Sequence, residues 1–357
     1  MEIARPFDLV EGPLLRVKLI RIADNEHLLV LTCHQIVTDA WSLGLFAREL
    51  AELYSNFTAG QSSPLPALST QYADYAVWQQ RWLADAAVEK QLAFWKEQLT
   101  GWPTLALTNP PNPSSNRSAV KSVILEKSLL QKLRAFNASE SVTTYMTLLT
   151  VYKLVIAAWK NTADVVVGSP ESGRRRSETE TLLGCFVNML PLRTRLRPED
   201  TFRSLLNRVR ETTAQAFANA DVPFENIQAT LRRHDATRSR LFQVWFGPID
   251  ALQPFVMGGV QVALQPVFPP EAQFDLSCFV SENADSIRLF FEFKEETLNS
   301  AQLDEMLRQF RRVLTEACDH PEMPLGKFLQ PLNASRPEPA PAAPAQTLTL
   351  ANHTVRN

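Results

Sequence analysis

The sequence predicts an α+β fold, and three observations lead to it. Short β-branched runs and longer stretches with helical spacing mix along the chain, without the strict strand–helix–strand order of a parallel α/β sheet. The composition, 45% hydrophobic and 21% charged, is typical of a globular protein with a core. The length of 357 residues corresponds to about two domains, and a proline-rich break at 103–118 offers the boundary between them.

Before this break the sequence predicts a strand pair followed by helices. Residues 14–22 and 27–34 are short, apolar and joined by a polar turn, which is typical of a hairpin. Residues 42–57 have helical spacing. Residues 70–99 form a longer helical stretch, rich in aromatic rings and broken once, and we expect those rings in the core.

Beyond the break, strands and helices are intermixed. The predicted strands are 119–125, 164–168, 186–196, 242–246, 260–264, 274–281 and 287–293, and the predicted helices are 128–136, 143–159, 201–217 and 299–318. The last helix has a capping-box pattern, Asn299 with Gln302. We therefore divide the chain into 1–102, 103–330 and a Pro/Ala-rich tail or linker at 331–357, whose composition predicts disorder.

Charge and composition exclude several classes of protein. With 36 Lys and Arg against 38 Asp and Glu, the net charge of −2 argues against nucleic acid or an anionic membrane as a partner. No apolar stretch reaches the ~20 residues that span a bilayer, and the N-terminus lacks the apolar segment of a secretory signal. We expect a cytoplasmic protein. The four cysteines lie far apart without clustered histidines, so we expect no metal site.

The most informative stretch for chemistry is 33–42, between a predicted strand and a predicted helix. Phosphate-binding glycine loops and nucleophile-elbow motifs are absent from the sequence. His34 and Asp39 stand in one short turn, where functional side chains are often presented. On residue type alone, a structural histidine is favoured over a catalytic one. The glycine-containing loop before Arg174, Arg175 and Arg176 is interpreted as a solvated connection rather than an anion site.

Six sequence elements, in order, resemble those of the condensation domains of non-ribosomal peptide synthetases. They are PFDL with GPLLR at 6–16, HQIVTDA at 34–40, YADYAVWQ at 72–79, GCFVNMLPLR at 184–193, DVPFE at 221–225 and the arginine-rich segment 233–243. The resemblance implies two lobes, each like chloramphenicol acetyltransferase, that form a V around a central tunnel. It also implies an acyltransferase of secondary metabolite biosynthesis: the amine on one carrier protein attacks the thioester on another and forms an amide bond. Both substrates would arrive on phosphopantetheine, with no cofactor or metal bound.

The resemblance assigns the catalytic turn to His34, Gln35 and Asp39. Gln35 stands where the family has a second histidine, and an amide cannot take up a proton near neutral pH. Ala40 stands where the family has glycine, and its Cβ disfavours positive φ. Asp39 has a structural role in the family, held by an arginine, and Arg193 is the expected partner.

Further residues follow from the same motifs. Ala40, Trp41, Ser42 and Asn188 are expected to face the substrate tunnel. For Asn188, and likewise for Asp221 and Arg233, capping or bracing of the second lobe is favoured over a direct part in catalysis.

The family carries a further stretch before PFDL, so the resemblance implies an incomplete first lobe, completed by another chain or lost by truncation. Three interpretations stay open. The first is an amide-forming module with impaired activity, served by carrier proteins and neighbouring synthetase modules. The second is a non-catalytic module that docks carriers or a tailoring enzyme. The third is a remnant without function. Among the remaining histidines, none is an obvious replacement for the missing base.

Overall fold

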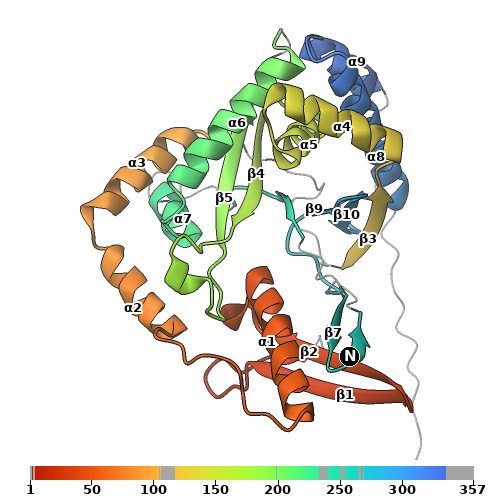
Figure 1. Ribbon diagram of the computed structural model, residues 1–357. Helices are drawn as coiled ribbons and strands as arrows, with labels where there is room; N and C mark the ends of the chain where they lie inside the picture. Colours follow the sequence, from red (N-terminus) through yellow and green to blue (C-terminus); the bar gives the residue numbers. More distant parts are fainter. Residues whose placement is uncertain are drawn as a thin grey trace, which may run out of the picture.

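The computed structural model describes residues 2, 5–103, 105, 117–197, 199–232, 240–249, 254–263, 267 and 269–334, without the side chains of 330–334. Figure 1 shows a smaller part, built from the first two strands and the first helix, next to a larger part built on a six-stranded sheet. The arrangement is a mixed α+β fold.

The smaller part begins with an antiparallel ribbon. Its elements are β1 (Leu15–Ala23), β2 (Glu26–Cys33), the short 3-10 helix η2 (Gln35–Val37) and α1 (Ala40–Thr58). Helix α1 begins after Asp39, because the side chain of Asp39 accepts a hydrogen bond from the backbone N–H of Ser42 and so caps the helix. A small hairpin of β7 (Phe255–Met257) and β8 (Val260–Val262) contacts α1, where Gly258 N donates to Ser55 Oγ at 2.9 Å.

The aromatic-rich stretch is two helices with one break, as predicted. They are α2 (Tyr72–Trp82) and α3 (Ala86–Leu99). The expectation that the aromatic rings of this stretch all enter the core is wrong: Trp95 is buried, and Trp82 packs against the core from its edge. Tyr72 and Tyr75 instead lie against Phe186 of the larger part, with ring centroids 5.0 and 4.6 Å away. Helix α2 therefore packs against the segment around Phe186, which is far from it in the sequence.

The larger part contains a mixed sheet in the order β3-β10-β9-β6-β4-β5. Its strands are β3 (Ser118–Ile124), β4 (Asp164–Glu171), β5 (Asn188–Arg195), β6 (Val244–Pro248), β9 (Leu276–Glu282) and β10 (Ile287–Lys294). Strand β6 runs parallel to both β4 and β9, and the other neighbours are antiparallel. The side chains on its buried face are mostly Val, Leu and Phe, as expected of strands covered by helices.

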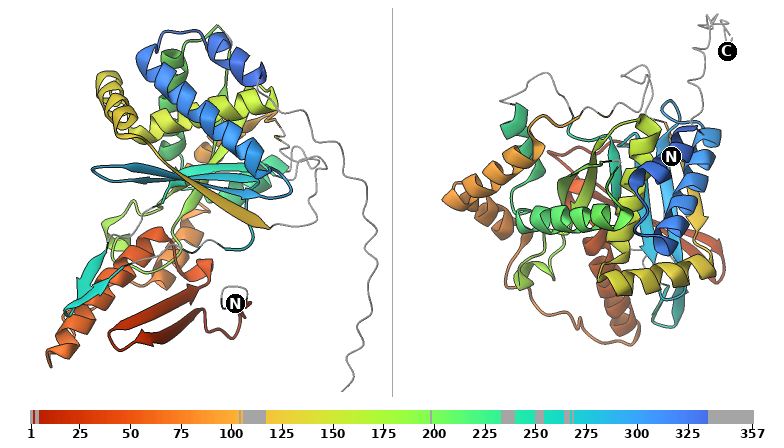
Figure 2. Two further views of the ribbon diagram at one scale, coloured as in Figure 1. Left: turned by 90° about the vertical axis from the view of Figure 1, so that its right-hand side faces the viewer. Right: turned by 90° about the horizontal axis from the view of Figure 1, so that it is seen from above.

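Helices cover one face of this sheet. They are α4 (Lys127–Glu140), α5 (Thr144–Lys160), α6 (Phe202–Ala218), α8 (Ser300–Asp319) and α9 (Leu325–Ala334). Helix α5 is the central one and is buried continuously from Thr147 to Ala158. The left view of Figure 2 shows the helices above the sheet and the ribbon and α1 below it. The face of the sheet opposite these helices is thus turned toward the smaller part.

The predicted elements are found within a few residues of their expected bounds, and the capping box of Asn299 and Gln302 is confirmed. Among the described residues, the α-helices and strands that were not predicted are β7, α9 and α7 (Phe224–Arg232), and the short 3-10 helices η2 and η3 (Ser177–Thr179) were not predicted either. Helix α9 continues to Ala334, so the first residues of the expected tail at 331–357 are helical. Residues 335–357, most of the expected break at 103–118, and Arg233, for which a bracing role was expected, lie outside the described residues.

Of the helices in the described ranges, none is long and apolar enough to cross a membrane alone. The pair Lys127–Glu140 and Thr144–Lys160, bent by 105°, meets the length and composition criteria jointly.

Candidate functional site

The candidate site is built around residues 34–42, here called the histidine turn, which connect β2 to α1. His34 is half-buried, and its Nδ1 accepts a hydrogen bond from the backbone N–H of Ile36 at 3.1 Å. A neutral imidazole that accepts at Nδ1 carries its proton on Nε2. In this arrangement His34 presents an N–H donor, not a base, through its free nitrogen.

Gln35 and Ala40 both lie at the surface of the histidine turn. Gln35 opens the 3-10 helix and is exposed. Ala40 is the first residue of α1, and it is not among the positive-φ residues of the described chain. The expected backbone strain at Ala40 is therefore wrong, because the turn enters a regular helix here and a Cβ fits that conformation.

Asp39 is buried and its carboxylate is fully engaged. It accepts hydrogen bonds from Ser42 N at 2.8 Å, from Phe186 N at 3.0 Å and from Arg174 Nη2 at 3.1 Å. A carboxylate whose oxygens already accept from three donors is not available to a substrate. Asp39 therefore organises the histidine turn.

The expected pairing of Asp39 with Arg193 is wrong. Arg193 pairs with Asp164, with Nη2 and Oδ2 2.7 Å apart, and it also donates to backbone carbonyls at the end of α3. The reason is strand register: Arg193 lies opposite Val166 on β4, close to Asp164 at the start of that strand. The structure places Arg193 in the larger part, where it attaches α3 to the sheet.

The arginine that holds Asp39 is Arg174, from a segment here called the arginine loop (172–187). Its side chain is 1% exposed. Its Nη2 donates to the Asp39 carboxylate and the Ser42 hydroxyl. Its Nη1 donates to the carbonyls of Thr179 and Leu182. The guanidinium carbon also lies 4.1 Å from the centroid of the Phe186 ring. From the sequence, Arg174 was interpreted only as part of a solvated cluster, because nothing local distinguishes it from its two arginine neighbours.

The residues assigned to the tunnel divide into two groups. The Ser42 hydroxyl is buried: it donates to Gly184 O at 2.8 Å and accepts from Gly184 N at 3.0 Å and from Arg174 Nη2 at 2.7 Å, so it has no capacity left for a substrate. Asn188 braces the start of α7, with Nδ2 donating to Val222 O and Oδ1 accepting from Phe224 N. The bracing contacts expected of Asn188 are thus present.

Trp41 combines anchoring with exposure. Its indole Nε1–H donates to Glu180 O of the arginine loop at 3.0 Å, yet 46% of the residue surface is exposed. Tyr72 anchors the same loop from α2, through its hydroxyl to Cys185 O at 2.8 Å. The histidine turn and α2 therefore both hold the arginine loop, and Trp41 retains surface that a ligand can contact.

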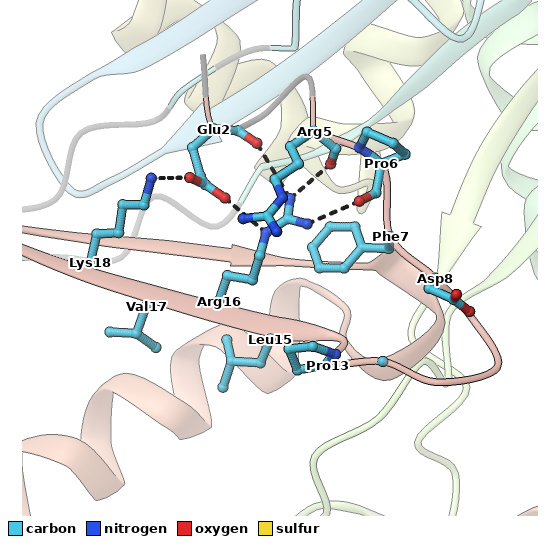
Figure 3. A pocket seen from close by; sticks show the side chains of 11 residues that line it. Glu2, Arg5, Pro6, Phe7, Asp8, Pro13, Leu15, Arg16, Val17 and Lys18 are labelled. Atoms are coloured by element: carbon cyan, nitrogen blue, oxygen red, sulfur yellow. Dashed lines mark hydrogen bonds and ion pairs between the residues drawn. The ribbon is translucent and has the colours of Figure 1, made fainter.

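A pocket of about 450 Å³ lies where the N-terminal segment crosses β1, as Figure 3 shows. It is lined by Glu2, Arg5, Pro6, Phe7, Asp8, Gly12, Pro13, Leu15, Arg16, Val17 and Lys18. Phe7 connects this pocket to the site, because its ring meets the ring of His34 edge-on, with centroids 5.7 Å apart. In the sequence Phe7 was only part of a family motif, and its contact with His34 was not predicted.

The thiols near the turn are unreactive by environment. Burial raises the pKa of Cys33, and burial together with the charge of Asp39 raises the pKa of Cys185. Neither thiol is a ready nucleophile. Within the described ranges, no group of three or more His, Cys, Asp or Glu side chains is arranged to hold a metal ion.

Comparison with known proteins identifies the family. Residues 1–336 match the Condensation domain family. The chain belongs to this family. Condensation domains act on substrates bound to carrier proteins through phosphopantetheine, and the family reaction is peptide bond formation in non-ribosomal synthesis.

Among related sequences, this condensation domain is similar to part of a linear gramicidin synthase polypeptide of Brevibacillus parabrevis. The two are 37% identical over 340 residues, which is 92% of this chain and 6% of the synthase polypeptide. It is 34% identical to the phosphinothricin tripeptide synthetase PhsC of Streptomyces viridochromogenes, over 85% of this chain and 28% of that protein. The chain thus spans a small part of the relatives that it matches.

Solved structures show the same fold. The X-domain from teicoplanin biosynthesis superposes with a TM-score of 0.81 at 24% identity, over 91% of this chain and 76% of that one. The X-domain in complex with OxyB gives a TM-score of 0.79 at 23% identity, over 91% and 74% of the two chains. The first condensation domain of the CDA synthetase gives 0.72 at 21% identity, over 88% and 69%.

Proposed function

We propose that this condensation domain forms an amide bond between a carrier-bound acyl or peptidyl thioester and a carrier-bound amine, and that it does so slowly. The amine nitrogen attacks the thioester carbonyl carbon. A C–N bond forms, the C–S bond breaks, and the proton lost by nitrogen ends on the sulfur of the released phosphopantetheine thiol. Atoms and electrons balance without a metal or nucleotide.

The observation that carries this proposal is the state of His34. With Nδ1 engaged by Ile36 N, its Nε2–H is a donor that can stabilise the negative charge developing on the thioester oxygen. The rigid attachment of the turn through Asp39 and Arg174 supports this role, since a donor acts efficiently when it is held in place.

The slow rate follows from Gln35. Its amide can orient an amine by hydrogen bonding, but it cannot accept the proton that the amine loses. A general base typically contributes about 10²–10⁴ in rate. The reaction would then depend on the fraction of amine that arrives already neutral.

The proposed partners are carrier proteins and neighbouring modules of a synthetase, and we propose that the two parts of the chain form the V and tunnel through which the carriers' arms reach His34. We also propose that further synthetase polypeptide covers the ribbon β1–β2. Val17, Leu19 and Ile22 are 54, 67 and 59% exposed, and apolar surface of this kind is normally buried against protein.

A second candidate function is docking without catalysis. Two features favour it: Gln35 has no basic group, and the arginine loop is still anchored to Asp39 and Trp41. A module that only binds a partner needs a firmly held surface but no general base. The X-domain superposes well on this chain and is seen in complex with OxyB, so a tailoring enzyme is one proposed partner of such a module.

One experiment separates the two. Donor and acceptor carrier domains from the chain's own synthetase are loaded from a panel of aminoacyl coenzyme A esters, mixed with the chain, and examined by intact-protein mass spectrometry. The first proposal predicts a dipeptidyl carrier above the rate without protein, and its loss in His34→Ala. Carrier binding by calorimetry with no product at any loading contradicts the first proposal and favours docking.

A further inference from the structure

Phe7 packs against His34 from outside the histidine turn. The two rings lie 5.7 Å apart between centroids with their planes at 77°, which is an edge-to-face contact. Phe7 belongs to the segment that precedes β1, whereas His34 follows β2. The ring of His34 is therefore held from two directions: by a hydrogen bond from within its own turn, and by an aromatic ring from another segment.

Arg16 on β1 holds Phe7 in turn. Its guanidinium carbon lies 3.8 Å from the centroid of the Phe7 ring. The same guanidinium donates to the carbonyls of Arg5 and Pro6 at 2.8 and 3.1 Å, directly before Phe7, as Figure 3 shows. Its side chain is 12% exposed, and Nε lies 2.8 Å from the carboxylate of Glu2. The planar guanidinium of Arg16 thus fixes both the backbone before Phe7, through two carbonyls, and the Phe7 ring, on which it stacks.

An imidazole with one hydrogen bond at Nδ1 is not fully fixed. The torsion that turns the ring is broad and roughly two-fold, so a flipped orientation is accessible to an imidazole that nothing else holds. In a flipped ring, Nδ1 leaves Ile36 N and the donor at Nε2 is no longer aimed as before. The packed ring of Phe7 opposes that rotation, because the imidazole would have to turn out of its plane against Phe7 on the way to the flipped position.

We propose that Phe7, held by Arg16, is a positioning residue for His34: it keeps the imidazole with Nδ1 on Ile36 and Nε2–H free for the substrate. The part of this inference that concerns the substrate rests on the proposed function. The orientation of the ring does not, and it is measured without turnover.

The test uses ¹⁵N-histidine labelling of the full chain, which has five histidines, with the His34 signals assigned by their loss in His34→Gln. The inference predicts one tautomer for His34 in the wild type, with the proton on Nε2. Phe7→Leu and Arg16→Lys should both give averaged ¹⁵N shifts, while Phe7→Tyr, which keeps the ring, should retain the wild-type pattern.

A matched control is available on the same strand. Arg21→Lys alters an exposed arginine of β1 that pairs with Asp24, and it should leave the His34 signals unchanged. If Phe7→Leu does not fold, the inference is tested by comparing the His34 ¹⁵N signals of Arg16→Lys with those of Arg21→Lys. An unchanged His34 tautomer in Arg16→Lys, or an equal change in Arg21→Lys, overturns the inference.

Kinetics give a second readout when the wild type turns over. A positioning role predicts that kcat falls by about tenfold in Phe7→Leu while KM stays within about twofold, because the ring orients a donor and binds no substrate. A change confined to KM contradicts the inference. Loss of the single tautomer in Phe7→Leu, with a wild type that shows no turnover, would sustain the inference and contradict only the proposed reaction.

Discussion

The carboxylate of Asp39 and the guanidinium of Arg174 form a buried ion pair between segments 135 residues apart in the sequence. The nearest atoms are 3.1 Å apart, and the side chains are 4% and 1% exposed. Backbone groups and Ser42 engage further donors and acceptors of both groups. The pair therefore fixes the histidine turn to the larger part of the fold, and it does so without chemistry of its own.

This pairing predicts strong coupling between the two residues. Asp39→Asn and Arg174→Gln should each lower the free energy of unfolding by about 3–5 kcal/mol, because each leaves the other charge buried and unpaired. The double variant should lose less than the sum, with a coupling of about 1–3 kcal/mol. Urea unfolding of the four proteins of the cycle measures it.

Arg193 supplies the matched control for this cycle. Because it pairs with Asp164 instead, Arg193→Gln combined with Asp39→Asn should be additive within about 0.5 kcal/mol. Additivity in the Asp39–Arg174 cycle, or strong coupling between Asp39 and Arg193, would contradict the described arrangement.

Gly184 gives a steric test of the contact between α2 and the arginine loop. A Cβ at Gly184 would lie 2.1 Å from a ring carbon of Tyr72. The backbone cannot move away easily, because Gly184 N donates a hydrogen bond to Ser42 Oγ. Gly184→Ala should therefore destabilise the protein by about 1–3 kcal/mol. Tyr72→Leu added to Gly184→Ala should recover part of that loss in a thermal melt, whereas a double variant as unstable as the sum of the two changes would count against the contact.

Much of the fold was accessible from the sequence because it depends on local patterns. The hairpin of β1 and β2, the break between α2 and α3, and the capped start of α8 are each specified by residues within a few positions of one another. Helix α7 was missed because its segment was interpreted as a family motif, and β7 because a short hairpin strand carries little pattern.

The candidate site was less accessible because it depends on tertiary contacts. His34, Gln35 and Asp39 were found from their motif, but Arg174 and Phe7 are separated from them by long stretches of chain. In sequence, Arg193 was as good a partner for Asp39 as Arg174. Only the register of β4 and β5, which brings Arg193 to Asp164, distinguishes the two.

Lys153 predicts a pH dependence of stability. Its ammonium nitrogen lies within the core, where it donates to Leu192 O at 2.9 Å and Thr194 Oγ1 at 2.7 Å, and burial lowers the pKa of Lys153 to about 7. Between about pH 7 and its ordinary pKa near 10.5, the unfolded chain binds a proton that the folded chain does not. Raising the pH in this window therefore stabilises the fold, by up to about 1.4 kcal/mol per pH unit from this residue.

Urea unfolding of the wild type and Lys153→Met between about pH 7.5 and 9.5 measures this contribution. The unfolding free energy of the wild type minus that of Lys153→Met should increase steadily as the pH rises through this range. Parallel pH profiles for the two proteins would mean that Lys153 keeps its proton when buried.

The most direct test of the account is the rate of amide formation by Gln35→His with loaded carrier domains. Gln35 is exposed on the histidine turn and cannot take up a proton, whereas a histidine there would serve as the general base of the proposed reaction. The account therefore predicts a rate for Gln35→His about 10²–10⁴ times that of the wild type. Ala40→Gly, a change at the first position of α1, should leave the rate within about threefold, since an alanine and a glycine both fit there. A Gln35→His variant that folds, binds carriers and forms amide no faster than the wild type would contradict the claim that this position limits the reaction.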